Sequence, residues 1–139
     1  MASQAGTGKS VTSFRDLIVW QRSLQLCVAV YDLSRGFPRE ELYGLTSQIR
    51  RAAVSINSNI AEGHGRASAK QLLQFLSMAR GSCFEVQAQL LIAEQLGYCI
   101  PDSLTRCQGL CEEIGRMLFA TMKTLRAKHG LSEDLTTHP

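Results

Sequence analysis

Proline and aromatic side chains are scarce in this sequence. It has three prolines and one tryptophan in 139 residues, and aromatic residues make up 6%. A β-sandwich or barrel normally carries more turn-forming, β-branched and aromatic residues, so the composition argues against one. Charged residues are also sparse at 19%, whereas apolar residues reach 45%, which excludes a disordered tail or a low-complexity polymer. We therefore expect one all-α domain with a well-filled core.

A long apolar run, a secretory signal and an even set of cysteines are also missing. No segment approaches the roughly 20 apolar residues that a transmembrane helix needs. The five cysteines follow no short regular spacing: Cys27, Cys83, Cys99, Cys107 and Cys111. A disulfide framework is therefore not expected. We predict a cytoplasmic protein with reduced, mostly buried thiols and no membrane contact.

Motifs for catalysis, metal binding and nucleotide binding are absent or incomplete. A di-iron bundle needs Glu-x-x-His on two helices, and no such motif occurs. The segment 6–10 resembles the end of a phosphate-binding loop, but Ser3 stands where the first glycine is required. Cys107 and Cys111 lie one helical turn apart on core positions, so we expect buried thiols rather than metal ligands. We predict no catalytic site, no metal and no cofactor.

Apolar residues recur at helical spacing in four segments. We predict helices at about 13–36, 38–63, 68–97 and 101–130. The short connections between them indicate an antiparallel up-down-up-down four-helix bundle spanning residues 13–130. We expect residues 1–12 to form a flexible leader and residues 131–139 a disordered tail.

Each predicted helix has one main apolar stripe that would face the core. The first stripe comprises Phe14, Leu17, Leu24, Val28 and Tyr31, and the second begins at Leu42. The third helix has extra apolar residues about 100° from its main stripe, namely Leu73, Phe84 and Leu91. A single bundle does not need them, so they are either scattered surface residues or an oligomer contact, and we favour the contact.

Serine and asparagine are unusually frequent in the second predicted helix, although they are mediocre helix formers. Four polar residues lie four, four and three positions apart and form one stripe beside the core: Arg51, Ser55, Asn59 and Glu62. Ser82 and Glu85 lie on the corresponding flank of the third helix. These six residues form either a hydrogen-bonded polar seam between helices or a binding strip. We favour the seam.

Several motifs in order resemble one known family. They are the segment 14–21, Phe37-Pro38-x-Glu40, Tyr43-Gly44-Leu45, the segment 48–63, the segment 79–85, and Leu96-Gly97-Tyr98. Over about residues 14–128 the sequence resembles the bacterial four-helix bundle family of the 23S rRNA intervening-sequence protein. The resemblance implies an antiparallel four-helix bundle that assembles as a homopentamer with a central channel. It also implies nucleic-acid binding and a fold similar to the accessory variability protein of diversity-generating retroelements.

Basic residues outnumber acidic ones by seven to three between positions 35 and 80, within a net charge of +3 for the chain. The candidates for contact with RNA or DNA phosphates are Arg50, Arg66 and Lys70. Arg50 is expected on the solvent side, whereas Arg66 and Lys70 flank the start of the third helix, whose free N–H groups suit a phosphate. Two functions remain open: an oligomeric, non-catalytic nucleic-acid-binding bundle, or a protein–protein interaction scaffold that binds no nucleic acid.

Overall fold

Four long α-helices and two short 3-10 turns make up the computed structural model, which describes residues 13–131 and has no strand in that range. The elements are η1 (Phe14–Asp16), α2 (Ile18–Ser34), η2 (Arg39–Glu41), α3 (Leu45–His64), α4 (Ala69–Gln95) and α5 (Pro101–His129). The predicted all-α four-helix bundle is confirmed. The expected leader and all but the first residue of the expected tail lie outside the described residues.

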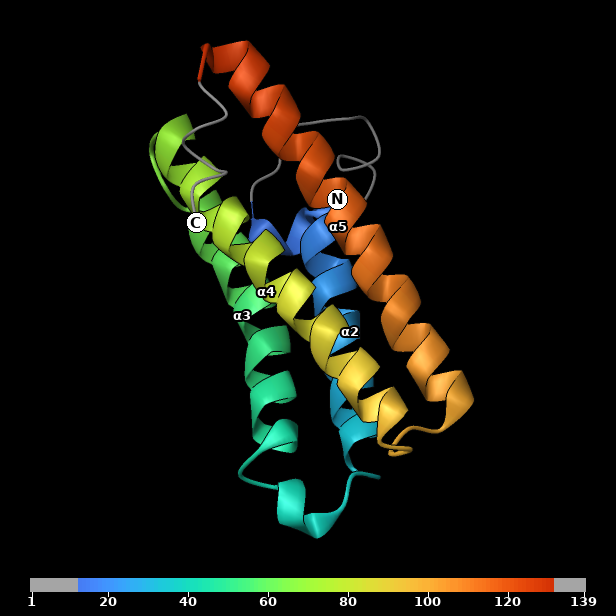
Figure 1. The fold of residues 1–139 in the computed structure, drawn as a ribbon. Coiled ribbons are helices and arrows are strands. Elements are labelled where there is room, and N and C mark those ends of the chain that lie inside the picture. The colour runs from blue at the N-terminus through green and yellow to red at the C-terminus, as the bar shows by residue number, and fades with distance from the viewer. Residues whose placement is uncertain (1–12, 132–139) are drawn as a thin grey trace.

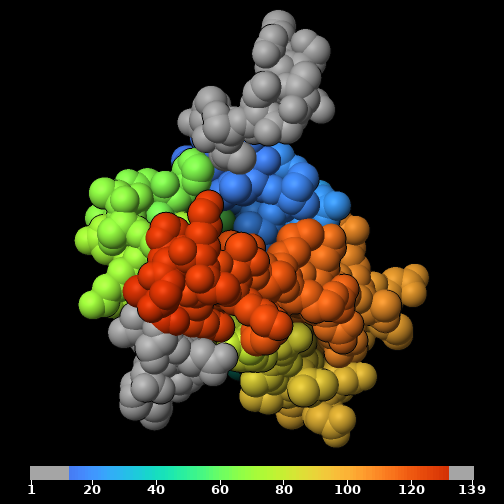
Figure 2. Space-filling view, turned by 90° about the horizontal axis from the view of Figure 1, so that it is seen from above, coloured from blue at the N-terminus to red at the C-terminus, as the bar shows by residue number. Residues whose placement is uncertain are grey.

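The helices form a cycle in which each one packs against two neighbours, in the order α2, α3, α4, α5 (Figure 1). Consecutive helices run in opposite directions in this view. The end-on view shows the end of α5 (red) in front, with the start of α2 (blue) and the segment around 60–75 (green) beside it (Figure 2). None of the described helices combines the length and the mean hydropathy that a membrane crossing requires.

Two of the four predicted helix starts are wrong. Ser13 caps only η1, because Leu17 is extended (φ −76°, ψ 127°) and α2 begins after it. Pro38 precedes η2, and α3 begins only at Leu45, whose N–H donates to Glu41 Oε1 at 3.0 Å. Leu42, expected at the start of the second core stripe, lies before α3 and is 48% exposed.

The predicted ends of α4 and α5 are confirmed. Gly97 and Gly130 have positive φ angles of 74° and 65°, a conformation that glycine adopts without steric cost. The following residues close each helix, since the N–H of Tyr98 bonds back to α4 at 3.0 Å and that of Leu131 bonds back to α5 at 2.9 Å. Leu131, expected in a disordered tail, is therefore tied to the bundle and packs against the core.

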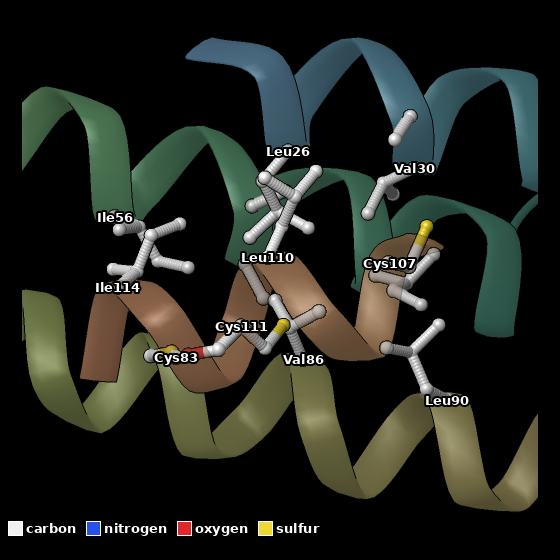
Figure 3. Close-up of a cluster of buried hydrophobic side chains, with 14 of the residues drawn as sticks. Leu26, Val30, Ile56, Cys83, Val86, Leu90, Cys107, Leu110, Cys111 and Ile114 are labelled. Carbon is white, nitrogen blue, oxygen red and sulfur yellow. Dashed lines mark hydrogen bonds between the residues drawn. The ribbon is translucent and has the colours of Figure 1, made fainter. Parts of the chain in front are cut away.

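The core runs along the centre of the bundle and takes side chains from all four helices (Figure 3). Leu26, Ile56, Val86 and Ile114, one from each helix, are fully buried. Cys83, Cys107 and Cys111 are buried as predicted, with exposures of 2%, 0% and 0%. The apolar spacing of α3, α4 and α5 therefore identified the faces that pack together.

The predicted core stripe of the first helix is wrong. Leu24, Val28 and Tyr31 are 46%, 57% and 37% exposed. The buried face of α2 consists instead of Ser23, Leu26, Ala29, Val30, Leu33 and Ser34. Two serines stand at the two ends of this inner face, and the extended residue Leu17 prevents the spacing that begins at Phe14 from continuing into α2. A second, outer apolar stripe was therefore mistaken for the core.

The predicted end of the second helix at about residue 63 is confirmed, since α3 ends at His64. Gly63 is buried where α3 meets α4. A Cβ atom added at this position would lie 2.9 Å from Phe75 Cβ and 3.1 Å from Leu72 Cδ1. Gly63, besides lying at the end of α3, therefore allows the two helices to approach closely.

Candidate functional site

A small hydrogen-bonded group joins α3 to α4 at the predicted polar seam. The hydroxyls of Ser55 and Ser82 lie 2.9 Å apart across the two helices. Asn59 Nδ2 donates to the carbonyl oxygen of Ser55 at 2.9 Å and to its hydroxyl at 3.1 Å. Three of the six seam residues are thus brought together. Glu62 turns away and pairs with Arg66 at 3.4 Å.

The other two seam residues, Arg51 and Glu85, are exposed and line a groove between α3 and α4. This α3/α4 groove has a volume of about 270 Å³ and is lined by Gln48, Arg51, Ala52, Ser55, Glu85 and Gln89. Within residues 13–131, no hydrogen bond or ion pair engages the guanidinium of Arg51 or the carboxylate of Glu85. Gln89 is only 8% exposed, and its Oε1 atom has no hydrogen-bond donor among the described residues.

Arg50 is not the solvent-facing cation that the sequence predicted. Its side chain is half-buried, and its Nε donates to the hydroxyl of Ser34 at 2.7 Å. Its guanidinium also lies 4.5 Å from the ring centroid of Tyr31. The expectation failed because Tyr31 was placed in the core, whereas it lies outside on α2 and offers a stacking surface. Arg50 also lies roughly 20 Å along α3 from the start of α4, at 1.5 Å per residue.

Arg66 and Lys70 lie together at the start of α4, as the sequence predicted. Ser68 caps this helix by accepting the N–H of Gln71 at 3.1 Å. The Arg66 side chain is 42% exposed, and its only charged contact among the described residues is the 3.4 Å pair with Glu62. Lys70 is exposed and makes no contact of this kind within the described part of the chain.

Charge is segregated between the two ends of the bundle, a feature that the sequence analysis missed. A small cavity of about 130 Å³ shows which segments meet, because its lining comes from the start of α2, the end of α3, the start of α4 and the last turns of α5. Residues 13–18, 60–72 and 119–131 at this end, called the basic end, hold six basic and two acidic side chains. Residues 31–46 and 92–106 at the opposite, acidic end hold three basic and five acidic ones.

An aromatic and arginine cluster marks the surface between α4 and α5. The Arg80 guanidinium lies 5.1 Å from the ring centroid of Phe84 and 5.3 Å from that of Phe119. Phe84, Leu91 and Phe119 are 55%, 54% and 47% exposed. Leu73 was expected on the same surface but is 1% exposed and belongs to the core. The true core stripe of α4 therefore includes Leu73, and only Phe84 and Leu91 remain as candidate oligomer contacts from the prediction.

A second apolar surface lies over α2 and α3, on the other pair of helices in the cycle. It consists of Leu24, Val28 and Tyr31 of α2 with Val54 of α3, which is 42% exposed. The bundle thus has two separate apolar faces, the α2/α3 face and the α4/α5 face, with the polar α3/α4 groove between them.

Two of the thiols are held protonated, and the described part of the chain forms no cluster of metal-ligating side chains. No three His, Cys, Asp or Glu side chains come together there in a way that could hold a metal ion. Burial raises the pKa of Cys27 and of Cys107 to about 11, so both thiols stay protonated at neutral pH. The described surface has exposed cations at one end, apolar faces on two sides and a polar groove between them.

Comparison with known protein families gives one match. Residues 15–120 fit the family model described as 23S rRNA-intervening sequence protein. This range covers more than half of the chain and includes α2, α3, α4 and most of α5. No curated protein matches the chain.

Proposed function

This chain belongs to the 23S rRNA-intervening sequence protein family, and we propose that it is a non-catalytic, oligomeric bundle that binds RNA or DNA through backbone phosphates at its basic end. The observation that carries the proposal is the segregation of charge. Six basic side chains and only two acidic ones gather at one end of the described bundle, whereas acidic side chains outnumber basic ones at the other. A concentrated basic surface attracts a polyanion far more strongly than the modest net charge of the chain would.

The start of α4 is the best-equipped part of the basic end. Lys70 is exposed and has no charged partner within residues 13–131. The pair between Arg66 and Glu62 is exposed on both sides, so its loss to a phosphate costs little. The first turn of a helix also has N–H groups without helical acceptors, and these favour an anion. Phosphate contacts of this kind hold a strand in place without reading its sequence.

Self-association would multiply these weak contacts. The α2/α3 face and the α4/α5 face are different surfaces on different helix pairs, which is what head-to-tail association into a closed ring requires. Phe84 and Phe119 on one face and Val28 on the other expose about half of their surface. We propose that they pair between neighbouring copies in a homopentameric ring. One strand crossing several basic ends would then bind far more tightly than to one copy.

Oligomer formation is tested by light scattering at micromolar concentration. The wild-type protein should give several times the chain mass of 15.3 kDa. Replacing Phe84 and Phe119 with serine should reduce the mass toward that of one chain, since both side chains are exposed and fill no core position. A matched pair, Leu96→Ser and Ile100→Ser, removes exposed apolar surface at the acidic end and should leave the oligomer intact. A monomeric wild type contradicts the ring.

Nucleic-acid binding is tested by electrophoretic retention of short RNA and DNA strands at about 50 mM and about 200 mM salt, since phosphate contacts weaken steeply over this range. Arg66→Glu with Lys70→Glu should abolish retention at the lower salt. Arg39→Glu with Arg106→Glu makes the same change in charge at the acidic end and should retain binding. Equal losses in both pairs would contradict a role for the basic end. A wild type that binds nothing at about 50 mM salt would favour the protein–protein scaffold instead, because the two apolar faces would remain to be explained.

A further inference from the structure

We infer that the α3/α4 groove binds one guanine base of a bound strand. The inference rests on the proposed nucleic-acid binding, which it deepens by adding a base-reading site to the phosphate contacts. The groove is the one polar hollow on the described surface that combines unpaired charges of both signs with an unsatisfied buried polar atom.

The α3 wall of the groove supplies hydrogen-bond donors. Arg51 is exposed, and its guanidinium has no hydrogen-bond or ion-pair partner within residues 13–131. A guanidinium has five N–H donors in a flat fork and no acceptor, so it pairs best with two adjacent acceptors in one plane. The floor beside it is small and fixed, because Ala52 has a short side chain and Ser55 is held by its bonds to Ser82 and Asn59.

The α4 wall supplies acceptors. Glu85 and Gln89 lie four residues apart, one helical turn, and both line the groove. The Oε1 atom of Gln89 is buried without a donor among the described residues. A buried acceptor without a partner is costly, so the Gln89 amide gains a hydrogen bond if it turns toward a donor placed in the groove.

The charged side chains of the two walls do not pair with each other. Arg51 and Glu85 line the same groove from opposite helices, yet no ion pair joins them. The volume between the walls is about 270 Å³. A flat ligand with hydrogen-bond acceptors on one edge and donors on the next would fit in this space. It would accept from the α3 wall and donate to the α4 wall.

Guanine has this arrangement of edges. Its O6 and N7 atoms accept from an arginine fork, and its N1–H and amino group are two adjacent donors for Glu85 and Gln89. Adenine presents one acceptor and one donor where the arginine needs two acceptors. Cytosine presents two adjacent acceptors but only one amino group for two acceptor residues. Bases of single strands can be splayed out and read in this way, whereas paired bases in an RNA helix cannot.

The experiment measures fluorescence anisotropy of labelled oligouridines of about ten nucleotides in which one central base is U, G, A or C. The strand with G should bind roughly tenfold more tightly than the others, as expected for one good bidentate contact. Arg51→Ala and Glu85→Gln should each remove this preference, so that the strand with G binds no more tightly than the all-U strand. Arg106→Ala and Glu94→Gln are matched controls at exposed positions away from the groove, and should keep the preference.

The outcomes separate this inference from the proposed function. Equal binding of all four strands, or a preference for A or C, overturns the guanine site but leaves phosphate binding at the basic end standing. Two results together support both the basic end and the guanine site. The double variant Arg66→Glu with Lys70→Glu loses all binding, and only the groove variants lose the preference for G. If no strand binds, titration with guanosine monophosphate decides: binding that Arg51→Ala abolishes assigns the groove to a free nucleotide and supports guanine recognition, and no binding overturns it.

Discussion

The hydroxyl of Tyr98 donates a hydrogen bond of 3.0 Å to Oε2 of Glu41, fifty-seven residues earlier in the chain. The other oxygen of the same carboxylate accepts the first N–H of α3, that of Leu45, at 3.0 Å. The Tyr98 ring also lies 5.5 Å from the ring of Phe37. Glu41 therefore ties together η2, the start of α3 and the connection between α4 and α5 at the acidic end.

Replacing Glu41 with alanine should lower the free energy of unfolding by about 1–2 kcal/mol, because the variant loses a helix cap and a hydrogen bond to tyrosine. Glu40→Ala removes the neighbouring carboxylate, which has no hydrogen-bond partner within residues 13–131, and serves as the control. Urea unfolding followed by circular dichroism measures both. Equal stabilities of the two variants would show that the Glu41 contacts contribute nothing.

Tyr98 should make stability depend on pH in the alkaline range. Its pKa is raised, first by the hydrogen bond to Glu41, then by partial burial and by the charges of Glu41 and Glu40. A raised pKa means that the folded state favours the neutral phenol. This contribution is fully present below the ordinary tyrosine pKa of about 10 and is lost as pH rises through the higher value in the folded protein. Tyr98→Phe should remove it, which unfolding experiments at a series of pH values would detect as a shallower decline.

Gly63 should not tolerate a methyl group. Gly63→Ala places a Cβ atom 2.9 Å from Phe75 Cβ, so α3 and α4 must separate, and we expect a loss of about 1–3 kcal/mol. The control is Gly109→Ala on α5, where an added Cβ meets nothing within 4 Å. That change should stabilise the helix by up to about 1 kcal/mol. Thermal melts of the two variants should therefore move in opposite directions, and a shift in the same direction would contradict the packing argument.

The buried thiol of Cys107 should react slowly with alkylating reagents. Burial raises the pKa of Cys107 to about 11, and the thiolate is the reactive species. Cys99 is only partly buried, so it should be modified first, which mass spectrometry of peptides can show. Because the pKa of Cys107 is raised in the folded state, its contribution to stability is present near neutral pH and is lost as pH rises through about 11. Modification of Cys107 in the folded protein as fast as Cys99 would contradict its burial.

Apolar spacing predicted most of the fold because three of the helices have one dominant stripe. It failed for α2, which has two apolar stripes: the outer one of Leu24, Val28 and Tyr31 continues, along the sequence, the spacing that begins at Phe14, whereas the inner, buried face begins and ends with serine. The delayed start of α3 was also missed, because it depends on Glu41, a residue outside the helix, capping its first turn.

Part of the candidate site was also visible in the sequence. The spacing of Ser55 and Asn59 placed polar groups beside the core, and the structure brings Ser82 to them. The basic end could not be read from the sequence, because its residues are far apart along the chain and meet only when four helices alternate in direction. The α3/α4 groove was missed for a similar reason, since an unpaired buried acceptor such as that of Gln89 is visible only once its neighbours are known.

The segregation of charge also gives the described bundle, residues 13–131, an electric dipole along the direction of its helices. Near a polyanion such a body turns basic end first before it makes contact, which shortens the search for a productive orientation. A ring of parallel copies would set these dipoles side by side, where they repel, and salt would relieve this repulsion because it screens charges over about 10 Å at 0.1 M. A strand lying across several basic ends would neutralise the same repulsion. Strand binding and ring closure would then reinforce each other. This coupling would be strongest at low ionic strength, where both the attraction to phosphates and the repulsion between parallel copies are least screened.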